Sequence, residues 1–118
     1  MFRFEELEIW KLSVSYANEM YKLAGAFPQK EMYALADQLR RAAVSISNNI
    51  AEGSGGTNKD FSNFLSMAVK SALETVNILY IAENQDYISK EIRLVHYEKA
   101  EEIIRKIRSF RNRLAANE

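Results

Sequence analysis

The residues with the clearest potential for binding chemistry are basic side chains close to the end of the chain. After residue 104 the sequence places five cations against one acidic residue, and an arginine pair lies earlier in the chain. Clustered Lys and Arg side chains neutralise phosphates. The candidate nucleic-acid contacts are Arg40, Arg105, Lys106, Arg108, Arg111 and Arg113.

These cations also have a structural interpretation. Glu101 and Arg105 are four residues apart with the acid first, as are Glu102 and Lys106, and this spacing favours ion pairs within a helix. Cations also stabilise the carboxyl end of a helix. On a helical wheel, the five terminal cations spread around the helix and do not form one stripe. Both interpretations stay open from the sequence alone.

A second polar set follows one side of the segment 29–52. Its members recur three or four residues apart: Gln38, Arg41, Ser45, Asn48, Asn49 and Glu52. Ser and Asn are poor helix formers, and within a helix they commonly make specific hydrogen bonds or bend it. The set is either a solvated helix face or a buried or interfacial polar network, with Arg41 and Glu52 as its charged ends. Such a network would fix register or partner choice.

The sequence contains no pattern typical of catalysis or metal binding. Cys is absent, which excludes disulfides and thiolate sites. The single histidine, His96, lies on an apolar helix stripe, where a core or interface histidine is expected. No Glu-x-x-His motif of carboxylate-bridged metal bundles occurs, and the loop Gly53–Gly56 lacks the Gly-Lys-Ser/Thr ending of a P-loop. We therefore expect no enzyme activity, no metal and no cofactor.

Four segments with helical apolar spacing must position these residues. Short breaks fall near Pro28, at Gly53–Thr57 and at Asn84–Ser89. The connections are short, so consecutive helices should run antiparallel. We predict an all-α fold in which residues 1–118 form a single domain, an antiparallel up-down-up-down four-helix bundle. Its helices should span about residues 5–25, 29–52, 58–84 and 89–115.

Two of these helices carry more apolar surface than one core contact requires. The first helix has an apolar stripe through Leu7, Trp10, Val14, Ala17, Tyr21 and Ala24, which we assign to the core. A second stripe lies about 130° away. The third helix has an apolar flank beside its main stripe. Either the core is wide, with ordinary exposed apolar residues, or this surface joins subunits. We predict a homo-oligomer whose interface contains Ile9, Leu12, Tyr16, Leu23, Leu73 and Tyr80.

The overall composition limits the function classes. The 118 residues are 47% hydrophobic, and 16 Lys and Arg balance 16 Asp and Glu to zero net charge. A disordered chain and a chain-wide polybasic surface are therefore excluded. No run of 18 apolar residues occurs, so we expect no membrane association. Residues 1–20 carry several charges and no signal-peptide pattern, and we expect a cytoplasmic protein.

The polar segment also carries a family resemblance. Residues 38–53, QLRRAAVSISNNIAEG, resemble the signature of a bacterial four-helix-bundle family. That family includes the proteins encoded in intervening sequences of large-subunit ribosomal RNA genes and the accessory variability proteins of diversity-generating retroelements. Residues 4–11, FEELEIWK, and residues 60–68, DFSNFLSMA, are similar to its other patterns. The resemblance implies a homopentameric ring and, for some members, binding to nucleic acid or to a reverse transcriptase.

Two functions follow from these observations. The first is a non-enzymatic oligomeric accessory protein that binds RNA or DNA, or a ribonucleoprotein or reverse-transcriptase partner. A ring would repeat each basic cluster and make phosphate binding multivalent. The alternative is a homo-oligomeric protein-protein interaction scaffold without nucleic-acid binding, which the second apolar face and the zero net charge favour.

Overall fold

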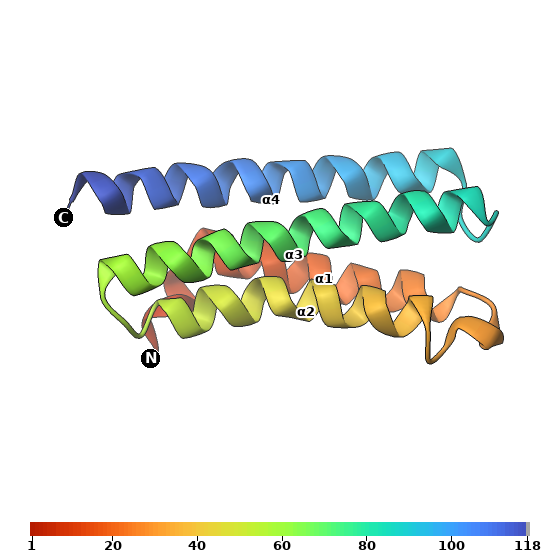
Figure 1. Ribbon diagram of the computed structural model, residues 1–118, viewed down its shortest axis with the longest axis horizontal. Helices are drawn as coiled ribbons and strands as arrows, with labels where there is room; N and C mark the ends of the chain where they lie inside the picture. Colours follow the sequence, from red (N-terminus) through yellow and green to blue (C-terminus); the bar gives the residue numbers. More distant parts are fainter. Residues whose placement is uncertain (118) are drawn as a thin grey trace.

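The computed structural model describes residues 1–117 as four long helices with two short 3₁₀ turns (Figure 1). No strand occurs in this part of the chain. Consecutive long helices run antiparallel, and both chain ends lie at the same end of the molecule, which measures 47 × 22 × 20 Å (Figure 1). The all-α, four-helix prediction is confirmed. The elements are η1 (Arg3–Glu6), α1 (Glu8–Gly25), η2 (Gln29–Glu31), α2 (Leu35–Gly53), α3 (Asn58–Asn84) and α4 (Lys90–Ala116).

Side-chain caps fix where the last two helices begin. The hydroxyl of Thr57 accepts a hydrogen bond from the Asp60 amide at 3.1 Å, and the Asp60 carboxylate accepts one from the Thr57 amide at 3.2 Å. Before α4, the Ser89 hydroxyl accepts a hydrogen bond from the Ile92 amide at 3.1 Å. Each cap satisfies backbone donors that the first helical turn leaves without partners.

The second helix begins at Leu35, six residues later than the predicted start at residue 29. Residues 29–31 form the turn η2, and Ala34 leaves the helical conformation with φ −123° and ψ −108°. The Glu31 carboxylate accepts a hydrogen bond from the Tyr87 hydroxyl at 2.6 Å, and this bond ties the connection to the loop before α4. The tertiary contact outweighs the local preference of Pro28 for a first helical turn.

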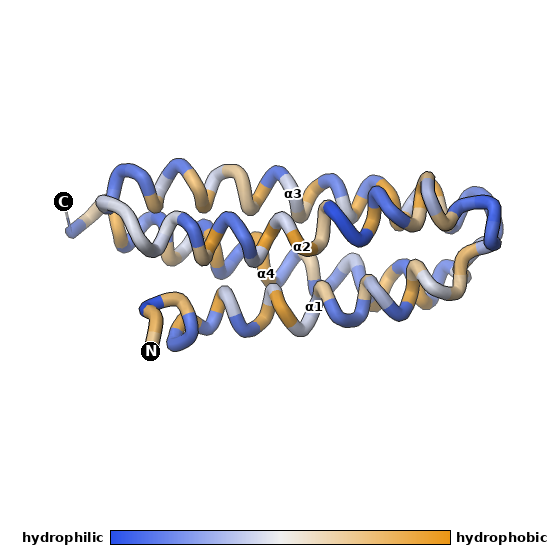
Figure 2. The backbone as a smooth tube through the Cα atoms, turned by 90° about the horizontal axis from the view of Figure 1, so that it is seen from below, coloured by the Kyte–Doolittle hydropathy of each residue, from blue (hydrophilic) through white to orange (hydrophobic). Residues whose placement is uncertain are grey.

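The core lies mainly between α2 and α3, with α1 and α4 packed against that pair (Figure 1). Hydrophobic and hydrophilic stretches alternate along every helix, as expected when one side of each faces the interior (Figure 2). Residues with no more than 1% exposure include Leu39, Ile46, Ile50, Phe61, Leu65, Leu79, Ala100 and Ile107. The helix α3 is long and apolar enough to cross a membrane by length and composition, but this set shows that it supplies part of the core.

The first helix turns a different side to the core than the sequence pattern suggested. Its buried residues are Ile9, Ser13, Tyr16, Ala17, Met20 and Ala24, whereas Tyr21, assigned to the core, is 50% exposed. The predicted interface role of Ile9 and Tyr16 is therefore wrong, because both lie inside the protomer. The Tyr16 hydroxyl has a buried partner, the Thr75 hydroxyl on α3 at 2.8 Å, so that this polar group can be buried.

Two ion pairs join the outer helices α1 and α4. Lys99 pairs with Glu19, and the Lys106 ammonium lies 2.6 Å from the Glu8 carboxylate. The contact between α1 and α4 is smaller than those that α2 and α3 make with each other and with their neighbours. Stability of the bundle therefore depends most on the α2–α3 packing.

Gly53, the last residue of α2, allows a close approach between α2 and α3. A Cβ atom at this position would lie 2.6 Å from the Phe64 Cβ and 2.9 Å from Cδ1 of the Phe61 ring. Phe61 is fully buried and cannot move aside easily. The loop after α2 can therefore turn tightly into α3 only with glycine here.

We expect Gly53→Ala to lower the free energy of unfolding by about 1–3 kcal/mol, the usual cost of overpacking. Chemical denaturation measures this change. Gly55→Ala is the matched control, because a Cβ there would have ordinary contact, 3.6 Å from the Glu52 carbonyl. Equal stability of both variants would show that the α2–α3 approach does not require glycine.

Candidate functional site

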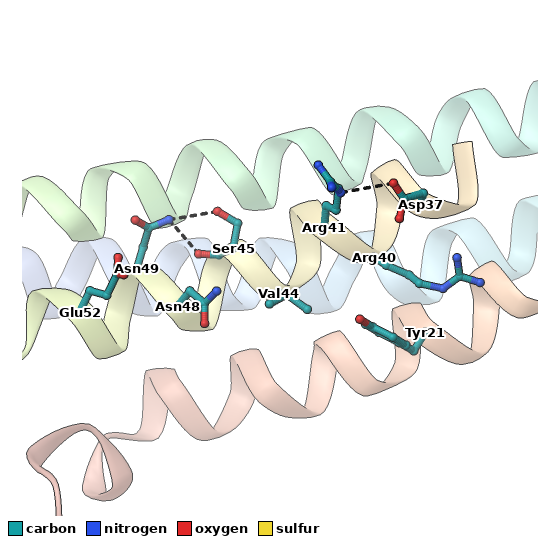
Figure 3. Close-up of a pocket in the computed structure, with 9 residues that line it drawn as sticks. All are labelled: Tyr21, Asp37, Arg40, Arg41, Val44, Ser45, Asn48, Asn49 and Glu52. Atoms are coloured by element: carbon teal, nitrogen blue, oxygen red, sulfur yellow. Dashed lines mark hydrogen bonds and ion pairs between the residues drawn. The ribbon is translucent and has the colours of Figure 1, made fainter. Parts of the chain in front are cut away.

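A polar groove runs along the outward side of α2, next to α1 (Figure 3). Its volume is about 440 Å³, and all but one of its lining residues come from α2. The lining residues are Tyr21, Asp37, Arg40, Arg41, Val44, Ser45, Asn48, Asn49 and Glu52. The groove contains five of the six residues in the polar set of the segment 29–52, all except Gln38, so the structure brings most of this set together on one surface.

The centre of the groove is held by hydrogen bonds. The side-chain Nδ2 of Asn49 donates to the Ser45 backbone carbonyl at 2.8 Å and to the Ser45 hydroxyl at 3.1 Å (Figure 3). Ser71 on α3 donates to the same Ser45 hydroxyl at 2.8 Å. The bond from Ser71 links α2 to α3. Periodicity within α2 gives no sign of Ser71, since its position opposite Ser45 depends on how the helices pack.

The charged ends of this polar set are not buried in the protomer. The Arg41 side chain is 81% exposed, and its Nε lies 3.2 Å from the Asp37 carboxylate. Gln38 and Glu52 are also exposed. A buried network that includes Arg41 and Glu52 is therefore excluded for the protomer, and the polar face of α2 is open to solvent or to a partner.

The neighbouring arginines Arg40 and Arg41 point to different sides of α2 (Figure 3). The Arg40 guanidinium lies over the Tyr21 ring, 5.8 Å from the ring centre, a cation–π contact with α1. Arg41 points away from α1, toward Asp37 (Figure 3). The pair is therefore not a single cationic cluster.

The predicted basic residues of α4 also face in several directions. Lys106 faces α1, where hydrogen bonds to the Glu8 and Glu102 carboxylates raise its pKa. Lys106 in turn holds the pKa of Glu8 below its usual range. Arg111 faces α3 and donates from Nε to the Ser62 carbonyl at 3.0 Å. The expected Glu102–Lys106 pair forms at 3.3 Å, whereas no Glu101–Arg105 ion pair forms in the described chain.

The cations left on the exposed surface of α4 are few. Arg113 donates to the Ser109 hydroxyl at 3.1 Å and lies over the Phe110 ring. Arg105 and Arg108 are exposed, and neither makes an ion pair within residues 1–117. Arg105, Arg108 and Arg113 therefore remain candidate phosphate contacts on α4, and of these only Arg105 and Arg108 make no side-chain hydrogen bond or ion pair within residues 1–117.

An apolar groove of about 190 Å³ lies between α3 and α4. It is lined by Leu73, Val76, Tyr97, Glu101, Ile104 and Arg108. Next to it, Tyr80 meets Tyr97 edge-on with ring centres 6.2 Å apart, and Arg93 lies over the Tyr80 ring at 4.5 Å. We call this surface, including Tyr80, the α3–α4 groove.

Two of the predicted interface residues lie on this groove with much of their surface exposed: Leu73 is 50% and Tyr80 41% exposed. Leu12 and Leu23 are half-buried on α1, and Ile9 and Tyr16 are core residues. The exposed apolar surface that the sequence assigned to both helices is therefore found mainly on the α3 side.

His96 is half-buried on α4, and its Nδ1 atom is buried without a hydrogen-bond partner in the described residues. Burial lowers the pKa of His96, and the charge of Glu19 acts in the opposite direction. No group of three or more His, Asp or Glu residues in the region 1–117 is arranged to hold a metal ion.

A scan against protein-family models matches residues 5–109 to the family described as 23S rRNA-intervening sequence protein. The chain belongs to this family. A similar solved structure is the crystal structure of a protein of unknown function from the S23 ribosomal protein family of Bacteroides thetaiotaomicron VPI-5482. It is 25% identical with a TM-score of 0.81, over 87% of this chain and 97% of that chain. No curated protein matches.

Membership in the 23S rRNA-intervening sequence family confirms the resemblance found in residues 38–53. The similar structure, whose function is described as unknown, supports the four-helix fold. The two surfaces described above, the polar groove of α2 and the α3–α4 groove, are therefore the candidate sites from which a function has to be argued.

We expect Tyr16→Phe to lower the free energy of unfolding by about 1 kcal/mol near neutral pH, because it removes the hydrogen bond to Thr75. Burial raises the pKa of Tyr16 from 10.0 to about 12. The stability that Tyr16 contributes is therefore complete below pH 10 and is lost as the pH rises toward 12. The difference in free energy of unfolding between the unmodified protein and Tyr16→Phe should therefore shrink as the pH rises from 10 to 12.

Denaturant unfolding as a function of pH measures this difference. The control is Tyr21→Phe, a half-exposed tyrosine, which should change stability by less than about 0.5 kcal/mol. If Tyr16→Phe had the same free energy of unfolding as the unmodified protein at every pH, the buried hydrogen bond between Tyr16 and Thr75 would not contribute to stability.

Proposed function

We propose that this chain is a non-enzymatic accessory protein that acts as a homo-oligomer, with the α3–α4 groove as a contact between protomers. The observation that carries this proposal is the exposure of Leu73 and Tyr80 beside Val76, Tyr97 and Ile104. Single exposed apolar residues are normal on monomers, but these residues are contiguous. Contiguous apolar patches with aromatic members are typical of protein interfaces.

The zero net charge of the chain is compatible with self-association, because copies do not repel one another. If the α3–α4 groove meets a different surface of the next copy, the contact is head-to-tail, and a head-to-tail contact that closes produces a ring. The sequence resemblance implies a ring of five subunits. A pentamer is therefore the assembly that we propose to test.

Leu73→Glu should weaken this assembly, because it places a charge in an apolar contact while the half-exposed position leaves the protomer folded. Light scattering coupled to gel filtration should then give a mass near the protomer mass of 13.6 kDa. The control is Asn63→Glu, which adds the same charge at an exposed position of α3 about 15 Å away along the helix and should leave the mass of the assembly unchanged. An unchanged mass for Leu73→Glu would contradict the α3–α4 contact.

Nucleic acid is the second candidate partner, and the exposed arginines Arg105 and Arg108 favour it. They make no ion pair within residues 1–117. Arg105 lies outside the α3–α4 groove, whereas Arg108 lines it, so a phosphate contact through Arg108 competes with a protomer contact there. The resemblance implies nucleic-acid binding for some members of the family, so structured RNA is the ligand to test first. A ribonucleoprotein or reverse transcriptase that carries such RNA is the corresponding protein partner.

For RNA contact through this pair, Arg105→Gln combined with Arg108→Gln should reduce the salt dependence of binding. The slope of log K against log salt should fall by about 0.7–0.9 for each phosphate contact that is lost. Fluorescence anisotropy with labelled structured RNA and duplex DNA, across a salt series, measures the slope. Lys22→Gln on α1 is the control. Equal slopes for the double variant and the control would exclude this RNA contact.

A further inference from the structure

The polar face of α2 has an internal symmetry in its charges and its hydrogen-bonding groups. Arg41, Ser45, Asn48 and Glu52 are spaced by four, three and four residues and therefore lie on one side of the helix. Arg41 stands as far before the midpoint of residues 46 and 47 as Glu52 stands after it. Ser45 and Asn48 are related in the same way. The cation and the carboxylate are about 16 Å apart along the axis.

Several polar groups on this face have unused hydrogen-bonding capacity in the protomer. Arg41 uses Nε for Asp37, which leaves the terminal nitrogens of an 81% exposed side chain available. Glu52 is exposed and makes no ion pair in the described part of the chain, and Asn48 makes no side-chain hydrogen bond there. By contrast, Ser45 and Asn49 are held in place by bonds to each other and to Ser71.

These observations define the partner that the face would accept. The partner must present a carboxylate opposite Arg41, a cation opposite Glu52, and small hydrogen-bonding groups between them. The reversed α2 of a second copy has this pattern. We propose that two copies of this chain associate through their α2 faces, antiparallel about a two-fold axis between positions 46 and 47, with Arg41 of each copy paired with Glu52 of the other.

The charge of the groove favours a second copy over a polyanion. Arg40 and Arg41 balance Asp37 and Glu52, so the groove has no net positive charge that would attract phosphates. The parallel arrangement of two α2 helices would place Arg41 against Arg41, which disfavours it. A contact made of polar residues, such as this α2–α2 contact, fixes register and orientation more than it adds affinity. The contact should therefore be specific but weak, and it should be strengthened when several copies are already joined.

This inference uses a different surface from the α3–α4 groove of the proposed function, so the two can be tested separately. The α3–α4 groove would join protomers into an assembly, and the α2 face would pair two protomers across a two-fold axis. Because the α2 contact is isologous, each copy supplies both halves of each ion pair. That property makes a charge-exchange experiment decisive.

The experiment measures the mass and dissociation constant of the full-length protein by sedimentation velocity over a concentration series. R41E and E52R each create like-charge contacts at both ends of the α2–α2 contact, so each should raise the dissociation constant about tenfold or more. The double variant R41E/E52R restores opposite charges and should restore association. An equimolar mixture of the two single variants should also associate, since every contact in the mixed pair is between opposite charges.

Asp37→Asn is the matched control, because it removes the ion pair that Arg41 makes within the protomer and leaves the α2–α2 contact in place. It should associate like the unmodified protein, and circular dichroism should show the same helix content for all variants. This control separates loss of pairing from a local effect on α2.

Three results would overturn the proposal. If R41E and E52R have no effect on association, the α2 face is not a contact. If both weaken association and neither the double variant nor the mixture restores it, α2 contacts a different surface, of another copy or of another partner. If Asp37→Asn weakens association as much as R41E, the effect is local. The first result, combined with dissociation by Leu73→Glu, would leave the proposed function intact.

Discussion

The close approach of α2 to the start of α3 at Gly53 is the constraint on which the rest of the bundle depends, because a Cβ there would lie 2.6 Å from the Phe64 Cβ and 2.9 Å from the Phe61 ring. The two helices that meet there carry most of the core. α1 packs on α2 and α4 packs on α3, and the ion pairs Lys99–Glu19 and Lys106–Glu8 join α1 to α4. The polar side of α2 and the groove between α3 and α4 are then left exposed, and these surfaces are where a partner can bind.

Local sequence signals predicted the fold and several helix ends. The predicted helix starts at residues 58 and 89 agree with α3 and α4 to within one residue, because Thr57 and Ser89 cap them and a cap needs only residues within one turn. The start of α2 was predicted too early, because Glu31 is held by Tyr87, 56 residues away. The core side of α1 was assigned only in part: Ala17 and Ala24 are buried as predicted, but Ile9 and Tyr16 are buried as well and Tyr21 is exposed. Both of its stripes have helical periodicity, and the decisive contact, Tyr16 with Thr75, spans 59 residues.

The candidate sites could be predicted only in part for the same reason. The polar residues of α2 lie on one face, as their spacing indicated, but Ser71 joins them from another helix. Glu101–Arg105 and Glu102–Lys106 have identical spacing, yet only the second pair forms, because Lys106 also meets Glu8 on α1. Periodicity shows which residues share a side of one helix. Which neighbour each side meets is decided by the packing of the four helices.

The central claim is that the working unit of this family member contains several copies of the chain. Sedimentation equilibrium of the unmodified protein from low to high micromolar concentration tests it most directly. We expect a mass that is a multiple of 13.6 kDa, with five copies as the assembly implied by the resemblance. A mass of 13.6 kDa at every concentration would contradict it, because the exposed apolar residues Leu73 and Tyr80 would then have no partner copy to cover them.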